Sequence, residues 1–262
     1  MSKVVWDVSD LYPVAKPKPA APRESTVPVP ASMTKLPTHG GFPVPWFVSD
    51  VPPPVERVPM KLGTALDDLA ILREGEKSPP DFRVVDGRKI FEAIRKNRCW
   101  ICGQEGLKRG FTFVGGPIGI FNRISAEPPS HRDCAIYAAK VCPFLSDPDR
   151  ERRDANVPNT RELAGFHVSH NPGVVAIWIT NTYRSQRLDG DGRMIFHRGD
   201  PSEVLWFHRG APAAPADIER GAVKAMEVLR DVYKNGGFTA AEFYGKEREF
   251  KALLEKAGVT LR

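Results

Sequence analysis

The chain has 262 residues and a formal net charge of +6, from 38 Lys and Arg against 32 Asp and Glu. This length is sufficient for one sizeable hydrophobic core or two small ones. No segment approaches the run of about eighteen apolar residues that a membrane-spanning helix needs, and the first residues lack the pattern of a signal peptide. We therefore expect no membrane segment and a cytoplasmic location.

Residues 1–60 are rich in proline and predict an extended arm. Proline lacks a backbone N–H and restricts the residue before it, so closely spaced prolines exclude long helices and central strands. The part up to about Leu36 is expected to be disordered or in polyproline II. Further along the arm, Phe42, Trp46 and Phe47 stand close together. We expect these aromatic residues to dock on the body of the protein or on a protein partner.

The next region, residues 61–145, is predicted to hold a helical segment followed by a metal-binding module. Thr64 is suited to be the N-cap of a helix over residues 65–73, which carries an apolar stripe. A second helix is expected over residues 86–97, where apolar residues recur at helical spacing among basic ones. This second helix leads directly into the first pair of metal ligands.

Two pairs of metal ligands stand in this region. Cys99 and Cys102 have the C-x2-C spacing that lets two thiolates bind one ion from a tight turn. Ser130 predicts a helix N-cap, and His131 and Cys134 then share one face of the first helical turn. Together the pairs predict a metal site, and zinc is the expected ion because it favours four sulfur and nitrogen ligands.

Cys142 is the alternative fourth ligand, in which case His131 would be displaced. A helix rises about 1.5 Å per residue, which puts Cys142 roughly 12 Å beyond Cys134. We therefore favour the set with His131, and expect Cys142 to be a buried apolar thiol. Ordinary core cysteines or disulfides are the remaining alternatives, and disulfides would require an oxidising compartment.

The segment between the two ligand pairs predicts a β-hairpin, because residues 110–114 and 118–121 are apolar and flank Gly115-Gly116-Pro117. A C-x2-C turn, a hairpin and a helix with two ligands in its first turn resembles the layout of treble-clef zinc fingers. The resemblance covers residues 99–144 and implies a structural zinc ion.

HNH endonucleases also resemble treble clefs, so a nuclease is an alternative function. Those enzymes place a general-base histidine on the hairpin, whereas no histidine occurs between Cys102 and His131. If His131 were the base, Cys142 would have to become the fourth ligand.

The positive charge is concentrated around the metal-binding segment. Residues 85–142 carry ten Lys and Arg against five Asp and Glu, while residues 1–84 and 143–262 are close to balanced. Such a patch predicts contacts with the phosphates of DNA or RNA. The alternative is a solvated basic face that assists solubility or meets an acidic protein. The candidate nucleic-acid contacts are Arg95, Lys96, Arg98, Lys108, Arg109, Arg123, Arg132 and Lys140.

Residues 146–262 predict an α+β domain after a charged connector over residues 146–160. Residues 174–180, 193–197 and 203–208 are β-branched or aromatic and predict three strands. Two helices follow and form a hairpin, the first over residues 216–234 and the second opening at a capping box of Thr239 and Glu242.

The sequence also resembles a group of uncharacterised proteins from phage and prophage-bearing bacterial genomes. The resemblance is carried by Cys99–Cys102, Ser125–Cys134 and Cys142–Leu145, and more weakly by residues 171–173 and 200–206. It implies a bacterial host cell as the setting, and no activity.

The expected fold is α+β, with a proline-rich arm, a treble-clef-like zinc module and a small antiparallel sheet packed with the C-terminal helices. The expected function is that of a non-enzymatic zinc protein, which binds nucleic acid or a protein partner through the basic face. A phage structural or host-takeover protein, docking through its arm, is a further alternative.

Overall fold

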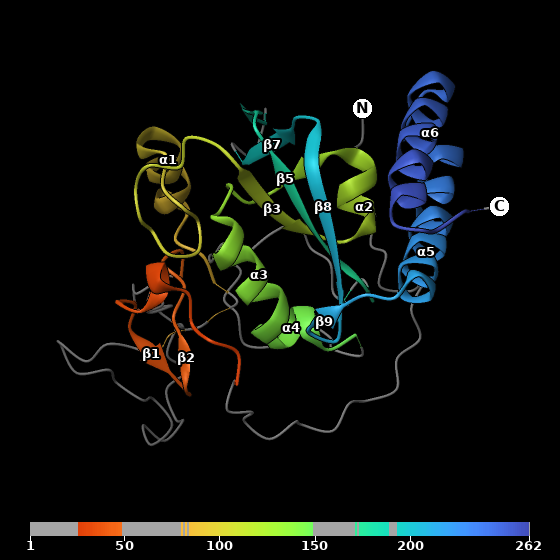
Figure 1. The fold of residues 1–262 in the computed structure, drawn as a ribbon. Helices are drawn as coiled ribbons and strands as arrows, with labels where there is room; N and C mark the ends of the chain where they lie inside the picture. The colour runs from red at the N-terminus through yellow and green to blue at the C-terminus, as the bar shows by residue number, and fades with distance from the viewer. Residues whose placement is uncertain are drawn as a thin grey trace, which may run out of the picture.

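The computed structural model describes residues 26–48, 80, 82, 84–148, 171, 173–188 and 193–261. It confirms a mixture of helices and antiparallel sheets. Figure 1 shows a central sheet with helices on both sides. The helix predicted over residues 65–73 lies outside the described residues. Within them, no helix is both long and apolar enough to cross a bilayer.

The helices are the 3-10 turn η2 (Ala31–Met33), α1 (Gly87–Lys96), α2 (Pro117–Asn122), α3 (Arg132–Val141), α4 (Pro143–Ser146), α5 (Pro215–Lys234) and α6 (Ala240–Lys256). The strands are β1 (Thr38–His39), β2 (Phe42–Pro43), β3 (Phe111–Gly115), β4 (Ile124–Ser125), β5 (Val175–Thr180), β6 (Tyr183–Arg187), β7 (Met194–Arg198), β8 (Pro201–His208) and β9 (Ala211–Pro212).

The central sheet has the antiparallel strand order β3-β5-β8-β9. All six residues of β5 are buried, as expected for the nearly continuous apolar run at residues 174–180. Trp178 of β5 lies opposite Phe113 of β3 and Val204 of β8. Strand β5 is therefore the centre of the core, and β3 holds the metal-binding segment against it.

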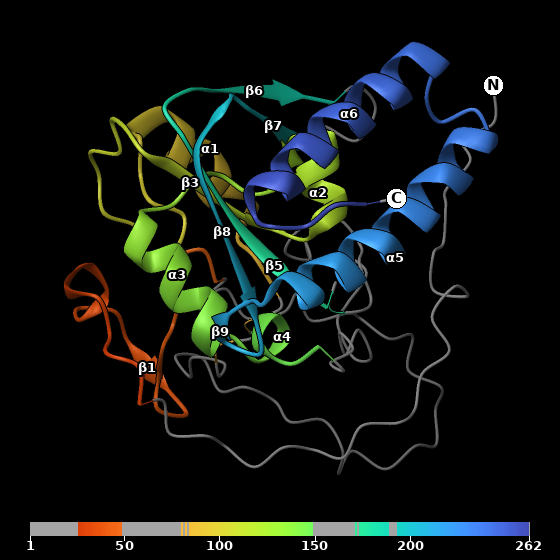
Figure 2. The ribbon, with the colours of Figure 1, turned by 45° about the vertical axis from the view of Figure 1, so that its right-hand side comes forward.

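Side chains of β5 alternate between two apolar layers, because successive residues of a strand point to opposite faces. Val175, Ile177 and Ile179 pack with Ala135 and Ala139 of α3. On the other face, Ala176 and Trp178 belong to the larger core with α2, α5 and α6. Figure 2 shows α3 on one side of the sheet and α5 and α6 on the other.

The three predicted C-terminal strands exist, but they do not form one sheet. Strand β7 pairs with β4 and β6 in a separate antiparallel sheet. Strand β6 was not predicted, because Arg184 and Gln186 are polar and exposed. Its apolar contact comes from Tyr183, whose ring lies edge-on to Phe111 at 4.8 Å between centroids.

The second strand of the hairpin predicted between the ligand pairs is wrong, because residues 117–122 form helix α2. Pro117 stands at the first helical position, where its missing N–H is not needed. The helix buries the adjacent residues Ile120 and Phe121 together in the core, whereas a strand would point them to opposite faces. Strand β3 pairs with β5 instead of with this segment.

The boundary that we predicted between residues 145 and 146 falls inside this shared architecture. Strand β3 precedes it and pairs with β5, which follows it, and α2 packs against α5 and α6. Within the described residues, the metal-binding segment and the C-terminal region therefore share one sheet and one core.

The C-terminal helical hairpin is confirmed. Helix α5 buries a stripe that includes Ile218, Ala222, Met226 and Leu229. Thr239 caps α6 by accepting a hydrogen bond from the backbone N–H of Glu242, whose carboxylate accepts one from the N–H of Thr239 in return.

A buried arginine joins β7 to β3 and α2. Arg198 is 5 % exposed, and burial lowers its pKa to about 9. Its guanidinium packs on the rings of Phe113 and Trp178 and donates a hydrogen bond to the carbonyl of Gly119 at 3.3 Å. A Cβ at Gly115 would lie 2.9 Å from this guanidinium, so glycine there makes room for it.

We expect Ile177→Ala to lower the free energy of unfolding by about 2–5 kcal/mol, because it removes a fully buried side chain between β5 and α3. Val223→Ala on α5, where the side chain is 44 % exposed, should change it by less than about 0.5 kcal/mol. Urea unfolding followed by circular dichroism measures both, and equal losses would contradict the assignment of β5 to the core.

Candidate metal centre

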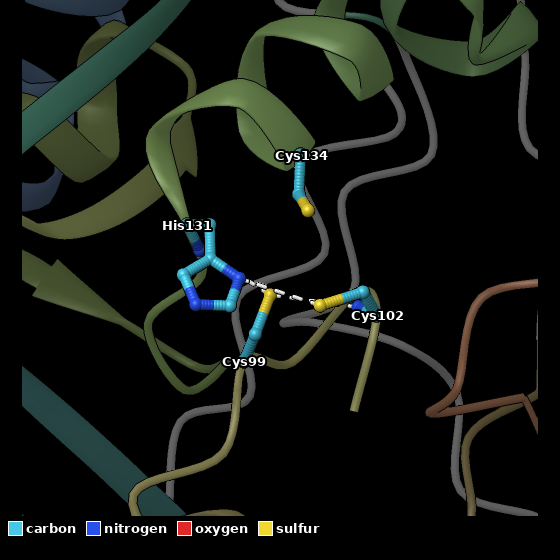
Figure 3. Close-up of side chains that lie close together, drawn as sticks. All are labelled: Cys99, Cys102, His131 and Cys134. Carbon is cyan, nitrogen blue, oxygen red and sulfur yellow. Dashed lines mark hydrogen bonds between the residues drawn. The ribbon is translucent and has the colours of Figure 1, made fainter. Parts of the chain in front are cut away.

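The four predicted ligands come together at one point. The sulfur atoms of Cys99, Cys102 and Cys134 and a ring nitrogen of His131 all lie within 4.8 Å of one another. Figure 3 shows the four side chains pointing to a common centre, two from the loop after α1 and two from the start of α3. The cysteines are buried and His131 is half-buried. This cluster can hold a metal ion.

The first pair is held by a tight loop after α1. That helix ends at Asn97, which has a left-handed backbone and whose carbonyl accepts hydrogen bonds from the N–H groups of Gly106 and Leu107. Within the loop, the N–H of Cys99 donates to Gln104 and the N–H of Gly103 donates to Cys99. Both sulfur atoms of the pair are thereby turned inward.

The second pair is held by the start of α3, one residue later than predicted. His131 is the N-cap, and Ser130 is not. The reason is that Ser130 exchanges two backbone hydrogen bonds with Thr112, at 2.8 and 3.2 Å, which keep it extended. Helix α3 therefore begins at Arg132, with Cys134 in its first turn and His131 just before it.

Hydrogen bonds to the sulfur atoms help to fix the cluster. Cys99 Sγ accepts from the backbone N–H of His131 at 3.2 Å and from that of Cys102 at 3.5 Å. Nδ1 of His131 lies 3.3 Å from Cys102 Sγ. The imidazole thus presents Nδ1 to the sulfurs, as a metal ligand would.

Side chains of the cluster strongly shift one another's protonation. Burial tends to raise the pKa of Cys99, but hydrogen bonds from Cys102, Cys134 and His131 outweigh it and hold this pKa far below its usual value. Hydrogen bonds to Cys102 and Cys99 raise the pKa of Cys134, and they raise that of His131 to about 10. An ion that binds here at neutral pH would therefore have to displace protons from His131 and Cys134.

Cys142 does not join the cluster. It follows the last residue of α3 and is the N-cap of α4, eight residues after Cys134. Cys142 is only half-buried, so the prediction of a fully buried thiol is wrong. All four cysteines lie in the described residues, and none of them is in a disulfide.

The described part of the arm covers the cluster, a contact that the sequence did not indicate. Met33 is 2 % exposed and packs with the three cysteines of the cluster. The hydroxyl of Ser32 lies 3.1 Å from Cys134 Sγ, and its carbonyl accepts a hydrogen bond from the side chain of Gln104. Ala31–Met33 is a 3-10 turn, which corrects the expectation of disorder or polyproline II at these residues.

The aromatic residues of the arm dock on the loop of the first ligand pair. The ring of Phe47 stacks on Trp100 at 5.1 Å, and Trp46 meets the same ring edge-on at 6.3 Å. The N–H of Trp46 donates to the carbonyl of Ile101 at 2.7 Å. Phe42 lies in β2, opposite His39 of β1. Of the two expectations for Trp46 and Phe47, docking on the protein's own body is the one observed.

Ion pairs involve four of the eight predicted nucleic-acid contacts. The pairs are Lys96 with Glu92, Arg98 with Glu105, Arg123 with Asp200 and Glu249, and Arg132 with Glu203. Arg123 and Arg132 thereby join α2 and α3 to neighbouring elements. Lys96 lies in α1, Arg98 in the loop after it, Arg123 directly after α2 and Arg132 in α3.

The other four predicted contacts, Arg95, Lys108, Arg109 and Lys140, make no ion pair with any described residue. Arg95, Lys108 and Arg109 are exposed on α1 and on the loop attached to its end, whereas Lys140 is half-buried on α3. The three exposed cations therefore lie on α1 and on the loop that continues from Cys102.

Comparisons with protein-family models, curated proteins and solved structures found no match to this chain.

We expect Ser32→Ala to weaken metal binding by about 10-fold or more, because groups that hydrogen-bond a metal ligand orient it and tune its basicity. Competition with a chromophoric zinc chelator measures the affinity. Thr34→Ala is the matched control, since its hydroxyl bonds only the carbonyl of Ala31 and it is exposed. Equal affinities for both variants would show that the hydroxyl of Ser32 does not support the site.

We expect Gly103→Ala to lower the free energy of unfolding by roughly 2–5 kcal/mol. Gly103 has a φ of +73°, and a Cβ there would lie 2.4 Å from the ring of Trp46. Gly106→Ala is the control, because its φ is +96° and no atom lies within 4 Å of its Cβ. The control should cost only the backbone term, about 1–2 kcal/mol. Thermal unfolding of the metal-loaded protein compares the two.

Proposed function

We propose that Cys99, Cys102, His131 and Cys134 bind one structural zinc ion, and that the protein is a non-enzymatic binding protein which contacts nucleic acid beside this site. The observation that carries the proposal is the meeting of three sulfurs and one imidazole nitrogen within 4.8 Å. Soft thiolates with imidazole suit zinc better than the oxygen-seeking ions magnesium and calcium.

The geometry of the cluster supports zinc with little adjustment. A tetrahedral ion with Zn–S bonds of about 2.3 Å places its sulfurs about 3.8 Å apart, so the separations need to shorten by at most about 1 Å. The N–H groups that point at Cys99 favour the thiolate that zinc requires.

The four ligands support a structural role for the ion. Four protein ligands complete a tetrahedral shell and leave no position for water or substrate, whereas catalytic zinc sites keep one open. The nuclease alternative needs His131 as a base and Cys142 as a ligand. His131 Nδ1 instead faces Cys102, and Cys142 lies at the far end of α3. We therefore favour binding over catalysis.

A relation to treble-clef fingers is part of the proposal. The bridge between Thr112 and Ser130 pairs the chain just after the first ligand pair with the chain just before the second. This bridge stands where the hairpin of a treble clef would close, with α2 and β4 inserted between its two sides.

Nucleic acid is the partner class that we favour. Arg95, Lys108 and Arg109 are exposed and make no ion pair with a described residue, which supports phosphate contacts. Trp46 and Phe47 already contact Trp100, so their use on a protein partner is less well supported. The phage or prophage setting belongs to the same proposal and rests on the sequence resemblance around Cys99–Cys102 and Ser125–Cys134.

Zinc content per chain tests the metal assignment. We expect about one zinc per chain in protein purified without added metal, its loss in His131→Ala and its retention in Cys142→Ala. Removal with a chelator should also lower the thermal stability of the whole fold, since metal binding contributes folding free energy. Zinc that survives His131→Ala but not Cys142→Ala would overturn the ligand set.

Binding of DNA and RNA by the same samples tests the partner class. We expect the affinity of the zinc-loaded protein to fall steeply as salt is raised from about 50 to 200 mM, because phosphate contacts release counterions. Absence of binding at the lower salt would remove nucleic acid as the partner and leave the zinc assignment intact.

A further inference from the structure

The outer face of α1 carries an exposed aromatic ring between two arginines. Phe91 is 51 % exposed, while Ile90 and Ile94 of the same helix pack inward against the core. Arg88 stands three residues before Phe91 and Arg95 four residues after it, so the three share one face. That face presents guanidinium, phenyl and guanidinium groups over about 10 Å of helix.

This face is open to a partner. Helix α1 lies at an edge of the molecule, on the side away from α5 and α6 (Figure 1). The side chain of Arg88 is 76 % exposed although it pairs with Asp86. Arg95 is exposed and makes no ion pair with a described residue. Phe91 exposes more than half of its surface, in contrast to the buried rings of Phe113 and Phe121.

The charge around Phe91 is positive. Glu92, the acidic residue beside it on α1, is paired with Lys96 at 3.2 Å and Arg98 at 3.4 Å. The loop that carries Lys108 and Arg109 is tied to the end of α1 by the bonds of Gly106 and Leu107 to Asn97. Two further exposed cations, without an ion pair to any described residue, therefore stand next to the helix end.

We propose that this face binds single-stranded nucleic acid, with a base stacked on Phe91 and phosphates held by Arg95 and the cations of the adjoining loop. The inference rests on the proposed nucleic-acid function and names its substrate class and the residue that selects it. A single strand offers both an unstacked base and a charged backbone to such a face, whereas a duplex keeps its bases stacked inside.

Fluorescence anisotropy of labelled oligonucleotides tests the proposal. Zinc-loaded full-length protein is titrated into single-stranded DNA, single-stranded RNA and duplex DNA of about 12 nucleotides or base pairs each. We expect both single strands, or one of them, to bind more tightly than the duplex. The DNA and RNA arms identify which strand the face prefers.

Variants separate stacking from charge. Phe91→Leu should weaken single-strand binding roughly 5- to 100-fold without changing its salt dependence, while Phe91→Tyr should retain it. Arg95→Gln should instead reduce the slope of log affinity against log salt by about 0.7. Tyr244→Leu is the matched control, since Tyr244 is 55 % exposed on α6, and it should bind as the wild type does.

Each failure has its own signature. Duplex bound as tightly as single strands, or Phe91→Leu binding like the wild type while its thermal unfolding is unchanged, would overturn the stacking site and leave the nucleic-acid function standing. No binding of any oligonucleotide by the zinc-loaded protein would remove both.

Discussion

The meeting of three thiol groups and one imidazole is the constraint on which the N-terminal half of the described structure depends. Thiolates gathered this closely in a buried place repel one another unless protons or a metal ion offset their charge. The cluster stays together despite this repulsion because backbone hydrogen bonds fix both of its halves. One half is attached to α1 through Asn97, and the other is fixed to β3 by the pairing of Ser130 with Thr112. Since β3 pairs with β5, the site is rigidly joined to the central sheet.

The sequence correctly predicted the features that depend only on residues close together in the chain. The spacing of Cys99 and Cys102, the stripe of α5 and the capping box at Thr239 each express a short-range rule, and all three are observed. The strand that pairs with β3 is distant in sequence, and we predicted the wrong partner: β3 pairs with β5 and not with residues 118–121. An apolar stretch such as residues 117–122 fits strand or helix equally well, and the core against α5 and α6 decided for the helix. The early turn at Ser32 and Met33 gave no signal because its partners, the cluster and the loop around it, are distant in sequence.

The fold pairs some of the basic residues with carboxylates and leaves others without an ion pair to a described residue. A count of basic residues treats Arg123 and Arg132 like Arg95, although the first two are paired with carboxylates from β8, α6 or the loop before β8. Exposed ion pairs contribute little to stability, so these two arginines mainly set how neighbouring elements meet. The basic residues that stay available to a partner depend on which acidic residues the fold brings near. For Arg123 and Arg132 those acidic residues are distant in sequence, so a local charge count does not include them.

The covering of the cluster by the arm has a consequence for the order in which the protein folds. Ser32 and Cys134 are 102 residues apart in sequence, and Trp46 depends on the carbonyl of Ile101. During synthesis the arm emerges first, but its binding surface exists only once the chain has been made as far as α3. The described part of the arm can therefore dock only late in folding. An ion that bound the cluster would reach the sulfur atoms more easily before Ser32 and Met33 cover them.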